Sequence, residues 1–428
     1  MLKILVIGIM IALALVPIVF FIIVRPLIPA HPVPSLQEHP TTTSQCHSTG
    51  ILEHIAFNPV VPFSKQSRQI SLTTTIGPHA EHPVILSLPI ILSSLEDKPY
   101  RMSDIALALA QMSTVVGSAT YSLRGRYLPE QRAYAERWIL RFGPGQYRHL
   151  HHEIIQLADM VEIDLSPLRG ITAVGGDQRP LPRRVARWIA FQKRIVMKSP
   201  APRKSLPQLI RYCRDWNPKV PLGIKILASH YLEEDLAVAV SYPIDFITVT
   251  GRESLTQSGG VFGIPTAVAV KRARDWMSLH GVAGISLLAS GGALTADDIA
   301  KLLALGADAV DIGPELLKTL IPITMAKQRG HQLDVGQLVL AGTQWLQSTA
   351  SELKAILLTV PAKTPQGLNR TMIYARTQEV SHLLDLPTAA SSAKNHVADL
   401  VRSLVAEYQR LIPRLQYQFA LLSDDRHA

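Results

Sequence analysis

The stretch ISLLASGGALTADDIAKLLALGADAVDIG, residues Ile285–Gly313, decides the fold because it holds a strand, a helix and a second strand. The apolar run that opens it predicts a buried strand, and the two glycines after that run predict a tight turn. Thr295, with Asp298 three residues later, fits a helix capping box, and Gly306 stands where the helix should end. The run Ala307–Ile312 then predicts the next strand. A strand, helix and strand in this order form the repeating unit of parallel α/β folds.

Outside this stretch, short apolar runs alternate with amphipathic segments, as expected for repeated βα units. An eighth strand is placed around Gly145–His149. The other seven predicted strands are Val84–Leu92, Val115–Thr120, Val161–Leu165, Gly223–Ala228, Phe246–Thr250, Ile285–Ala289 and Ala307–Ile312. Eight βα units predict an α/β protein with the TIM (β/α)8 barrel fold.

Glycines follow the last two predicted strands, where TIM barrels often bind phosphate groups. Ser290-Gly291-Gly292 ends the first of these strands and Gly313 ends the second. Glycines allow backbone N–H groups to approach phosphate oxygens closely, and a helix that follows adds its positive end. The alternative is that these glycines only make tight turns. Two such turns around one helix favour an ancestral phosphate site.

The N-terminal run Ile4–Val24 contains no charged side chain and is long enough to cross a bilayer as a helix. A cleaved signal peptide is the alternative, but the run is longer than a typical signal-peptide core. Residues 1–25 are therefore assigned to a transmembrane anchor that contacts membrane lipid, and 26–54 to a stalk. Residues 55–345 are assigned to the barrel, and 346–428 to a C-terminal helical extension.

The expected location is therefore a single-pass membrane protein. Lys3 and the N-terminal amine balance Arg25, so the flanking charges do not decide the orientation. A barrel on the cytoplasmic side is the working assignment.

The charge and composition of the chain favour some partners over others. Lys and Arg number 43 against 33 Asp and Glu, giving a net charge of +10, but the basic residues are dispersed and aromatic residues make up only 6%. This dispersal argues against nucleic-acid binding. The two cysteines, Cys46 and Cys213, are too few for an iron–sulfur cluster, and Cys213 shares an apolar helix face that predicts a buried, inert thiol.

From about Phe57 to Leu386 the chain resembles the FMN-binding synthase domain of ferredoxin-dependent and bacterial glutamate synthases, including stand-alone membrane-anchored relatives. The blocks that carry this resemblance are Thr74–Gly77, Gly117–Thr120, Leu128–Arg132, Gly223–Ile226, Ala289–Gly313 and Ser351–Lys354. The resemblance implies an FMN-dependent oxidoreductase that acts on a CH–NH2 donor or its imine, in glutamate metabolism.

The resemblance also implies site residues. It places Lys225 beside the flavin and Asp177 where relatives carry a glutamate that handles a proton. Lys225 lies in an apolar strand and so needs an anionic partner, unless its side chain reaches solvent at the strand end. Asp177 is alternatively an ordinary surface-turn residue. The implied cofactor contacts are Ser290, Gly291, Gly292, Gly313, Lys225, Thr250 and Gly251.

Several loops depart from the family pattern. Tyr121–Arg126 and Arg252–Gln257 replace glycine-rich loops, and Ser94–Lys98 replaces a segment under the flavin. Met325–Gly336 contains no cysteine where the family binds its iron–sulfur cluster, so no such cluster is expected. No glutaminase domain is recognised, and ammonia and electrons are expected from partner proteins or solution.

Two further clusters contain residue types that bind metal ions. His151-His152-Glu153 and Asp311–Glu315 lack zinc-ligand spacing, so both are predicted to be solvated polar positions and no metal is expected. Two functions remain open: a glutamate-synthase-type oxidoreductase acting on a small molecule, and a catalytically degenerate, membrane-anchored barrel that serves as a scaffold or small-molecule binder.

Overall fold

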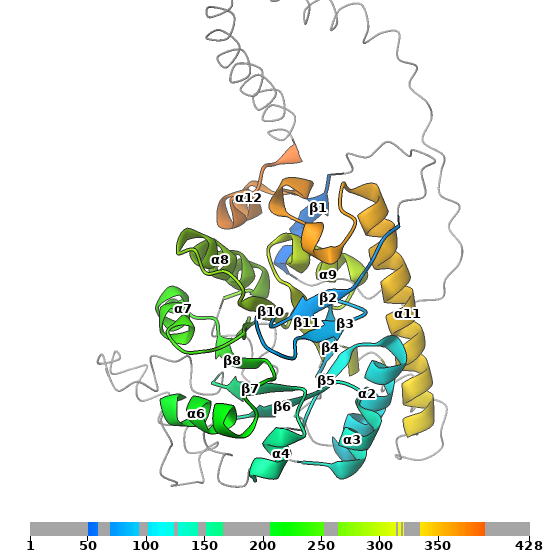
Figure 1. Cartoon of the computed structure of the whole chain (residues 1–428). Helices are drawn as coiled ribbons and strands as arrows, with labels where there is room; N and C mark the ends of the chain where they lie inside the picture. The colour runs from blue at the N-terminus through cyan, green and yellow to red at the C-terminus, as the bar shows by residue number, and fades with distance from the viewer. Residues whose placement is uncertain are drawn as a thin grey trace, which may run out of the picture. The chain divides into compact units, whose positions relative to one another are not determined.

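Eight parallel strands close into a barrel, and a helix follows each of them (Figure 1). The structure is a computed structural model that describes residues 50–58, 69–93, 102–123, 127–143, 151–165, 206–251, 264–313, 316–317, 320 and 334–389. These residues belong to one compact unit, Cys46–Ala428.

The barrel strands are β4 (Ile90–Leu92), β5 (Ala119–Tyr121), β6 (Trp138–Phe142), β7 (Met160–Asp164), β8 (Leu222–Leu227), β9 (Phe246–Thr250), β10 (Ser286–Ser290) and β11 (Ala309–Ile312). The helices that follow them are α2 (Met102–Val116), α3 (Pro129–Tyr134), α4 (His152–Gln156), α6 (Leu206–Trp216), α7 (Leu232–Val240), α8 (Thr266–Leu279), α9 (Ala296–Ala304) and α11 (Val335–Thr359). The closed order is β10-β11-β4-β5-β6-β7-β8-β9, so the first strand pairs with the last. The predicted TIM barrel is confirmed.

Three of the predicted strands differ in detail. The third barrel strand is β6, which the sequence pattern misses because Arg141 interrupts an otherwise apolar run, and Gly145–His149, where the eighth strand was predicted, lies outside the described residues. The predicted strand Val84–Leu92 is two strands, β3 (Val84–Leu86) and β4. Val115 belongs to the end of α2, where its side chain is exposed, and the strand begins only at Ala119.

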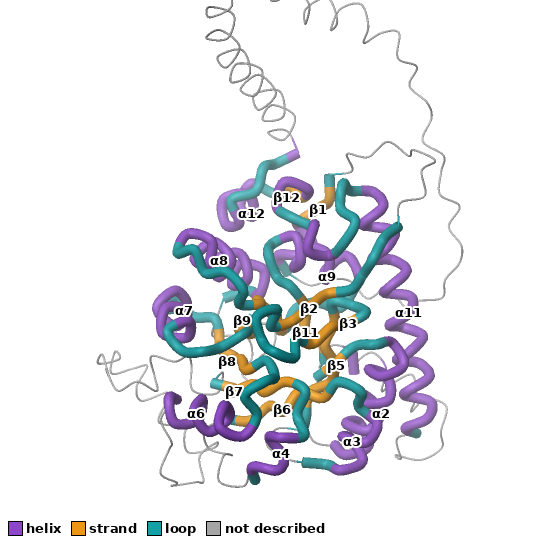
Figure 2. The backbone as a smooth tube through the Cα atoms, in the orientation of Figure 1, coloured by secondary structure: helices purple, strands orange, loops and turns teal. Residues whose placement is uncertain are grey.

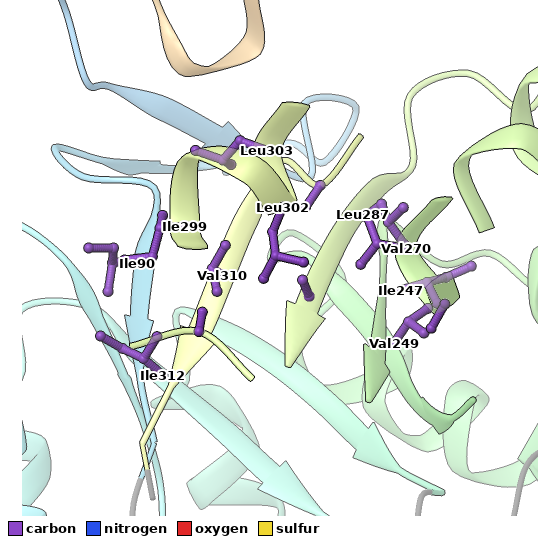
Figure 3. Close-up of a cluster of buried hydrophobic side chains, with 14 of the residues drawn as sticks. Ile90, Ile247, Val249, Val270, Leu287, Ile299, Leu302, Leu303, Val310 and Ile312 are labelled. Carbon is purple, nitrogen blue, oxygen red and sulfur yellow. The ribbon is translucent and has the colours of Figure 1, made fainter. Parts of the chain in front are cut away.

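The outer face of the barrel packs against the helices through apolar side chains. Figure 3 shows strand residues such as Ile247, Leu287 and Val310 meeting Val270 of α8 and Leu302 of α9. These side chains are buried, and their removal from water is the main stabilising contribution to such a core. Figure 2 shows the strands enclosed by the helices.

Helix α9 is fixed at both ends as expected. Thr295 caps it, accepting from the Asp298 N–H, while the Asp298 side chain accepts from the Thr295 N–H, which is a capping box. Gly306 follows the helix with a φ of 118°, a conformation that favours glycine.

The inside of the barrel follows the strand alternation and divides into two zones. Two layers near the amino-terminal strand ends are apolar: Ala119, Met160, Phe246 and Ala309, then Ile91, Ile139, Gly223 and Leu288. Two layers near the carboxyl ends are polar: Tyr121, Glu162, Thr248 and Asp311, then Ser93, Arg141, Lys225 and Ser290. Four residues per layer, drawn from alternate strands, is the packing expected of this fold.

A hairpin closes the amino-terminal end of the barrel. It consists of β2 (Thr74–Ile76) and β3, which pair antiparallel. Gly77 in its turn lies against Pro221 and Asp245, just before β8 and β9, and its N–H donates to Ser286 Oγ at 3.1 Å. The carboxyl end is therefore the side from which the polar layers can be reached.

A second small sheet joins segments far apart in the chain. Strand β1 (Ile55–Phe57) pairs antiparallel with β12 (Ile373–Ala375), which precedes α12 (Gln378–Leu384). The buried Lys301 Nζ of α9 donates to the Leu52 carbonyl at 2.8 Å and ties this region to the helix ring.

The predicted membrane localisation is corrected. Among the residues that the structure describes, none of the helices is both long enough and apolar enough to span a bilayer. The 25-residue helix α11 has the length, but charged and amide side chains such as Gln337, Glu352 and Lys354 interrupt it. The segment 1–25, on which the anchor was placed, lies outside the described residues, as does 390–428 of the predicted C-terminal extension. The division into 26–54, 55–345 and 346–428 stays a prediction.

Candidate functional site

Seven of the eight side chains in the two polar layers form one buried network, here called the ionic cluster: Tyr121, Arg141, Glu162, Lys225, Thr248, Ser290 and Asp311. Its side chains come from seven different strands, β5 to β11, and meet inside the barrel. Buried charges are stable only when they are paired and hydrogen-bonded. The contacts of each member therefore decide what the site can do.

Arg141 connects two sides of the interior. Its Nε donates to Glu162 Oε1 at 2.5 Å, and its Nη2 donates to Asp311 Oδ2 at 3.0 Å. The guanidinium carbon also lies 3.3 Å from the centre of the Tyr121 ring, which is cation–π geometry.

Glu162 collects donors on both carboxylate oxygens. Besides Arg141, the Thr248 hydroxyl donates to Oε2 at 2.5 Å and the Tyr121 hydroxyl donates to the same atom at 3.1 Å. Burial, followed by the negative charge of Glu162, raises the pKa of Tyr121 well above its usual value. Tyr121 is therefore a neutral donor and not a base at physiological pH.

Asp311 Oδ2 accepts three hydrogen bonds. Ser290 Oγ lies at 2.9 Å, Arg141 Nη2 at 3.0 Å and Lys225 Nζ at 3.3 Å. Burial alone would raise the pKa of Asp311, but the charges of Lys225 and Arg141 lower it to about 2. Asp311 is thus a carboxylate at any physiological pH.

Lys225 lies on β8 with its Nζ also 2.9 Å from Ser290 Oγ, and its side chain is 7% exposed. This small exposure excludes the alternative in which the ammonium reaches solvent at the strand end. The anionic partner that the sequence required is present, and within the described residues it is the carboxylate of Asp311.

The glycine turns lie above this cluster. Gly291 and Gly292 both have positive φ, 98° and 77°, and consecutive residues of this kind can point successive N–H groups into one concavity. Within the described part of the chain, the N–H groups of Gly291, Gly292 and Gly313 donate to no other residue. Leu317 N–H donates to Gly313 O at 2.9 Å, which is the residue spacing of an α-helical hydrogen bond.

Two more glycines at the mouth are required by close packing. A Cβ on Gly313 would lie 2.3 Å from Ser93 Oγ, and one on Gly251 would lie 2.0 Å from Thr266 Oγ1. Next to Gly251, the buried hydroxyl of Thr250 has no hydrogen-bond partner among the described residues. A hydroxyl and backbone N–H groups without partners at one barrel end suit an oxygen-rich ligand such as a phosphate ester.

The structure thus brings together Lys225, Ser290, Gly291, Gly292, Thr250, Gly251 and Gly313 at the carboxyl ends of β8 to β11. Their roles toward a cofactor stay predictions. Asp177 lies outside the described residues, as do Ser94–Lys98, Arg124–Arg126 and Arg252–Gln257.

The sequence interpretation missed five members of the cluster: Tyr121, Arg141, Glu162, Thr248 and Asp311. Asp311 was predicted to be solvated, which is wrong, because it faces the barrel interior and is 3% exposed. The available signal was a charged residue inside an apolar strand, as in Trp138–Phe142 and Met160–Asp164. Parallel strands are covered on both faces, so a charge within one must have a buried partner.

The other candidates are structural. Cys213 is buried on α6, and burial raises the pKa of its thiol to about 12, which makes it unreactive as predicted. The His152 ring stacks on Trp216 with centroids 4.1 Å apart. Among the described side chains, no three His, Cys, Asp or Glu residues gather as metal ligands would.

Comparison with known proteins now assigns the chain to a family. The conserved region in glutamate synthase matches residues 102–326, which is more than half of the chain. The chain belongs to the glutamate synthase family. This glutamate synthase region includes β5 to β11 and all seven members of the ionic cluster.

Curated relatives agree with this assignment. The glutamate synthase large subunit-like protein of Rhizobium meliloti is 26% identical over 56% of this chain and 56% of its own length. The archaeal-type glutamate synthase [NADPH] of Thermotoga maritima is 26% identical over 59% of this chain and 51% of its own. The chain therefore spans about half the length of the curated glutamate synthases that it matches.

Solved structures share the barrel. The flavin-binding domain of baker's yeast flavocytochrome b2 superposes with a TM-score of 0.52 at 11% identity, covering 76% of each chain. Inosine 5′-monophosphate dehydrogenase from Legionella pneumophila gives 0.50 at 14% identity, covering 77% of this chain and 98% of that one. At these identities the likeness shows the fold alone.

Proposed function

We propose that this chain is an FMN-dependent oxidoreductase of glutamate synthase type, acting on a CH–NH2 donor or its imine. Membership of the glutamate synthase family supports oxidoreductase chemistry in general. The substrate, the cofactor and the activity of a whole enzyme are part of the proposal, because the relatives are about twice as long as the matched region.

The observation that carries the proposal is the pairing of two features at the carboxyl end of the barrel. One is the set of backbone N–H groups of Gly291, Gly292 and Gly313, which have no acceptor among the described residues. The other is the buried ammonium of Lys225 on β8, three strands away from β11. A flavin mononucleotide has a phosphate for the first feature and a ring with hydrogen-bond acceptors for the second.

The residues would divide the work of binding. The glycine N–H groups would hold the phosphate through charge-assisted hydrogen bonds, and the hydroxyl of Thr250 would donate to an oxygen of the ligand. Lys225 would orient the ring by donating from Nζ. FMN, when bound, would supply the two-electron chemistry that amino acid side chains lack.

The barrel itself would exclude water from the deep side of the site. The hairpin β2–β3 covers the opposite end, and apolar residues such as Phe246 and Leu288 fill the lower layers. Electrons and ammonia would come from partner proteins or from solution, and the substrate would be a small molecule. Nucleic acid is not a proposed partner.

The second candidate is a barrel that binds a small molecule without redox turnover. The observation that favours it is that Lys225 already contacts Asp311 and Ser290, so its charge is balanced by the protein. Flavin binding and flavin reduction separate the two candidates.

The test is a titration of the purified protein with FMN, followed by flavin fluorescence. Gly292→Asp should abolish binding, because its carboxylate repels the phosphate and its side chain is strained at positive φ. Lys225→Met should weaken binding only modestly and lower the reduction potential, since a cation near the reduced ring favours reduction by about 1–3 kcal/mol.

A matched control is Gly281→Asp. Gly281 also has a positive φ, 64°, but lies in the turn before β10, and a Cβ there would meet no atom within 4 Å. This variant should bind FMN like the parent protein. If the parent protein binds no FMN even at excess cofactor, the oxidoreductase proposal fails and the non-redox binder stands.

A further inference from the structure

Asp311 occupies a position in which three donors converge on one carboxylate oxygen. Arg141 comes from β6, Lys225 from β8 and Ser290 from β10, and all three contact Oδ2 at 3.3 Å or less. Convergent cationic and hydroxyl donors around a single point are the arrangement by which proteins bind a free carboxylate.

The charges inside the ionic cluster balance. Arg141 and Lys225 carry two positive charges, and Glu162 and Asp311 carry two negative charges. Glu162 is already held by Arg141, Thr248 and Tyr121, so Asp311 is the carboxylate that compensates Lys225. Without Asp311 the buried ammonium would lack a counter-ion within the cluster.

We infer that Arg141, Lys225 and Ser290 form a carboxylate-binding site that the chain's own Asp311 occupies. A small carboxylate ligand binds beside Lys225 only when the Asp311 carboxylate has moved away or been removed. In the protein as it stands, the site discriminates against anionic groups at the Lys225 end of the barrel mouth. This inference needs no bound flavin, and it stands or falls separately from the proposed function.

The experiment replaces Asp311 and supplies the missing carboxylate from solution. Asp311→Ala removes the carboxylate and leaves a space close to the size of formate. Thermal unfolding is measured in sodium formate and in sodium chloride at matched ionic strength, without added FMN. The variant should melt below the parent protein in chloride, and formate should raise its melting temperature with a saturable dependence on concentration.

Three matched proteins define the specificity of the effect. The parent protein and Asp311→Asn should show no formate-specific shift, because a side chain already fills the site. Asp311→Ala/Lys225→Met should show none either, because the ammonium is gone. If formate raises the melting temperature of all four proteins equally, or of none, the inference is overturned.

Asp311→Ala could fail to fold in the absence of an anion. In that case, the yield of folded protein after refolding in formate and in chloride becomes the readout, and formate-dependent recovery is the supporting result. Equal recovery in both salts, or none in either, overturns the inference.

The flavin titration is read independently. Formate rescue without FMN binding keeps the carboxylate site and removes the oxidoreductase proposal. FMN binding without formate rescue keeps the oxidoreductase proposal and removes the carboxylate site. Where both hold, the reduction potential of bound FMN should be higher in Asp311→Asn than in the parent protein, since Lys225 is then no longer neutralised.

Discussion

Arg141 on β6 and Asp311 on β11 pair across the inside of the barrel, with Nη2 3.0 Å from Oδ2, although 170 residues separate them in the chain. Their strands are not neighbours, because β4 and β5 lie between them in the closed order. The ion pair therefore links opposite parts of the wall and depends on the barrel being closed. It also places the buried charge directly below the residues that would hold a ligand.

The first prediction concerns the loss of this link. Arg141→Met should lower the free energy of unfolding by about 3–5 kcal/mol, because Glu162 loses its cationic partner while it stays buried. Urea unfolding followed by circular dichroism measures the loss. The double variant Arg141→Met/Glu162→Gln should recover part of it, because the uncompensated charge is removed.

An exposed pair provides the control for this first prediction. Lys219 and Glu81 lie 2.7 Å apart with more than half of each side chain exposed. Lys219→Met should leave the urea midpoint unchanged within error. If Arg141→Met lowers the free energy of unfolding no more than Lys219→Met does, the buried Arg141–Glu162 pair contributes little to stability.

The second prediction concerns acid. An Asp in an unfolded chain titrates near pH ~3.9, whereas Asp311 in the folded protein has a pKa of about 2. The folded pKa is the lower one, so Asp311 stabilises the protein above pH ~4 and this contribution is lost as the pH falls toward ~2. The size of this contribution is about 2–3 kcal/mol. Asp311→Asn lacks the contribution at every pH.

The measurement for this second prediction is the free energy of unfolding of both proteins between about pH 6 and pH 2. The gap between the parent protein and Asp311→Asn should be largest near neutral pH and should narrow as the solution becomes acidic. A gap that stays constant over this range would contradict the depressed pKa.

The third prediction tests the lower layers of the barrel. A Cβ on Gly223 would lie 2.4 Å from the ring of Phe246, so Gly223→Ala should destabilise the protein by about 1–3 kcal/mol through overpacking. Phe246→Leu in the same chain should relieve part of the strain. Gly367→Ala is the control, since its Cβ would meet Ala362 at an ordinary 3.4 Å. Equal melting temperatures for Gly223→Ala and Gly367→Ala would contradict the close packing of Gly223 against Phe246.

The fourth prediction concerns the cap of α9. Thr295→Ala removes the side chain that accepts from the Asp298 N–H and should cost about 1 kcal/mol. Thr295→Ser keeps the acceptor and should stay close to the parent protein in chemical unfolding. Two equal midpoints for the Ala and Ser variants would mean that the capping box contributes nothing measurable.

Much of the fold could be predicted because the strand and helix signals are local. The unit Ile285–Gly313 carries its strand, cap and terminating glycine within one stretch, and the structure has each of them. The strand β6 was misplaced because Arg141 breaks its apolar pattern. The partner that explains Arg141 lies far away in the chain, so a local pattern cannot supply it.

The site was predictable only in part, for the same reason. The apolar neighbours of Lys225 require an anionic partner, and the sequence indicates that much. That the partner is Asp311 follows only from the closed strand order, which brings β8 and β11 to opposite sides of one interior. Asp311 alone, two residues before Gly313 and three before Pro314, resembles an ordinary polar residue at a strand end.

The small sheet of β1 and β12 has a mechanical consequence. Ile55, where the chain enters β1, lies opposite Ala375, where the chain leaves β12. A pulling force applied to the segments before Ile55 and after Ala375 would therefore act on the same end of the β1–β12 sheet and break its hydrogen bonds one after another. Breaking hydrogen bonds one after another needs less force than breaking all of them at once. The β1–β12 sheet would therefore open under tension before the strands of the barrel separate.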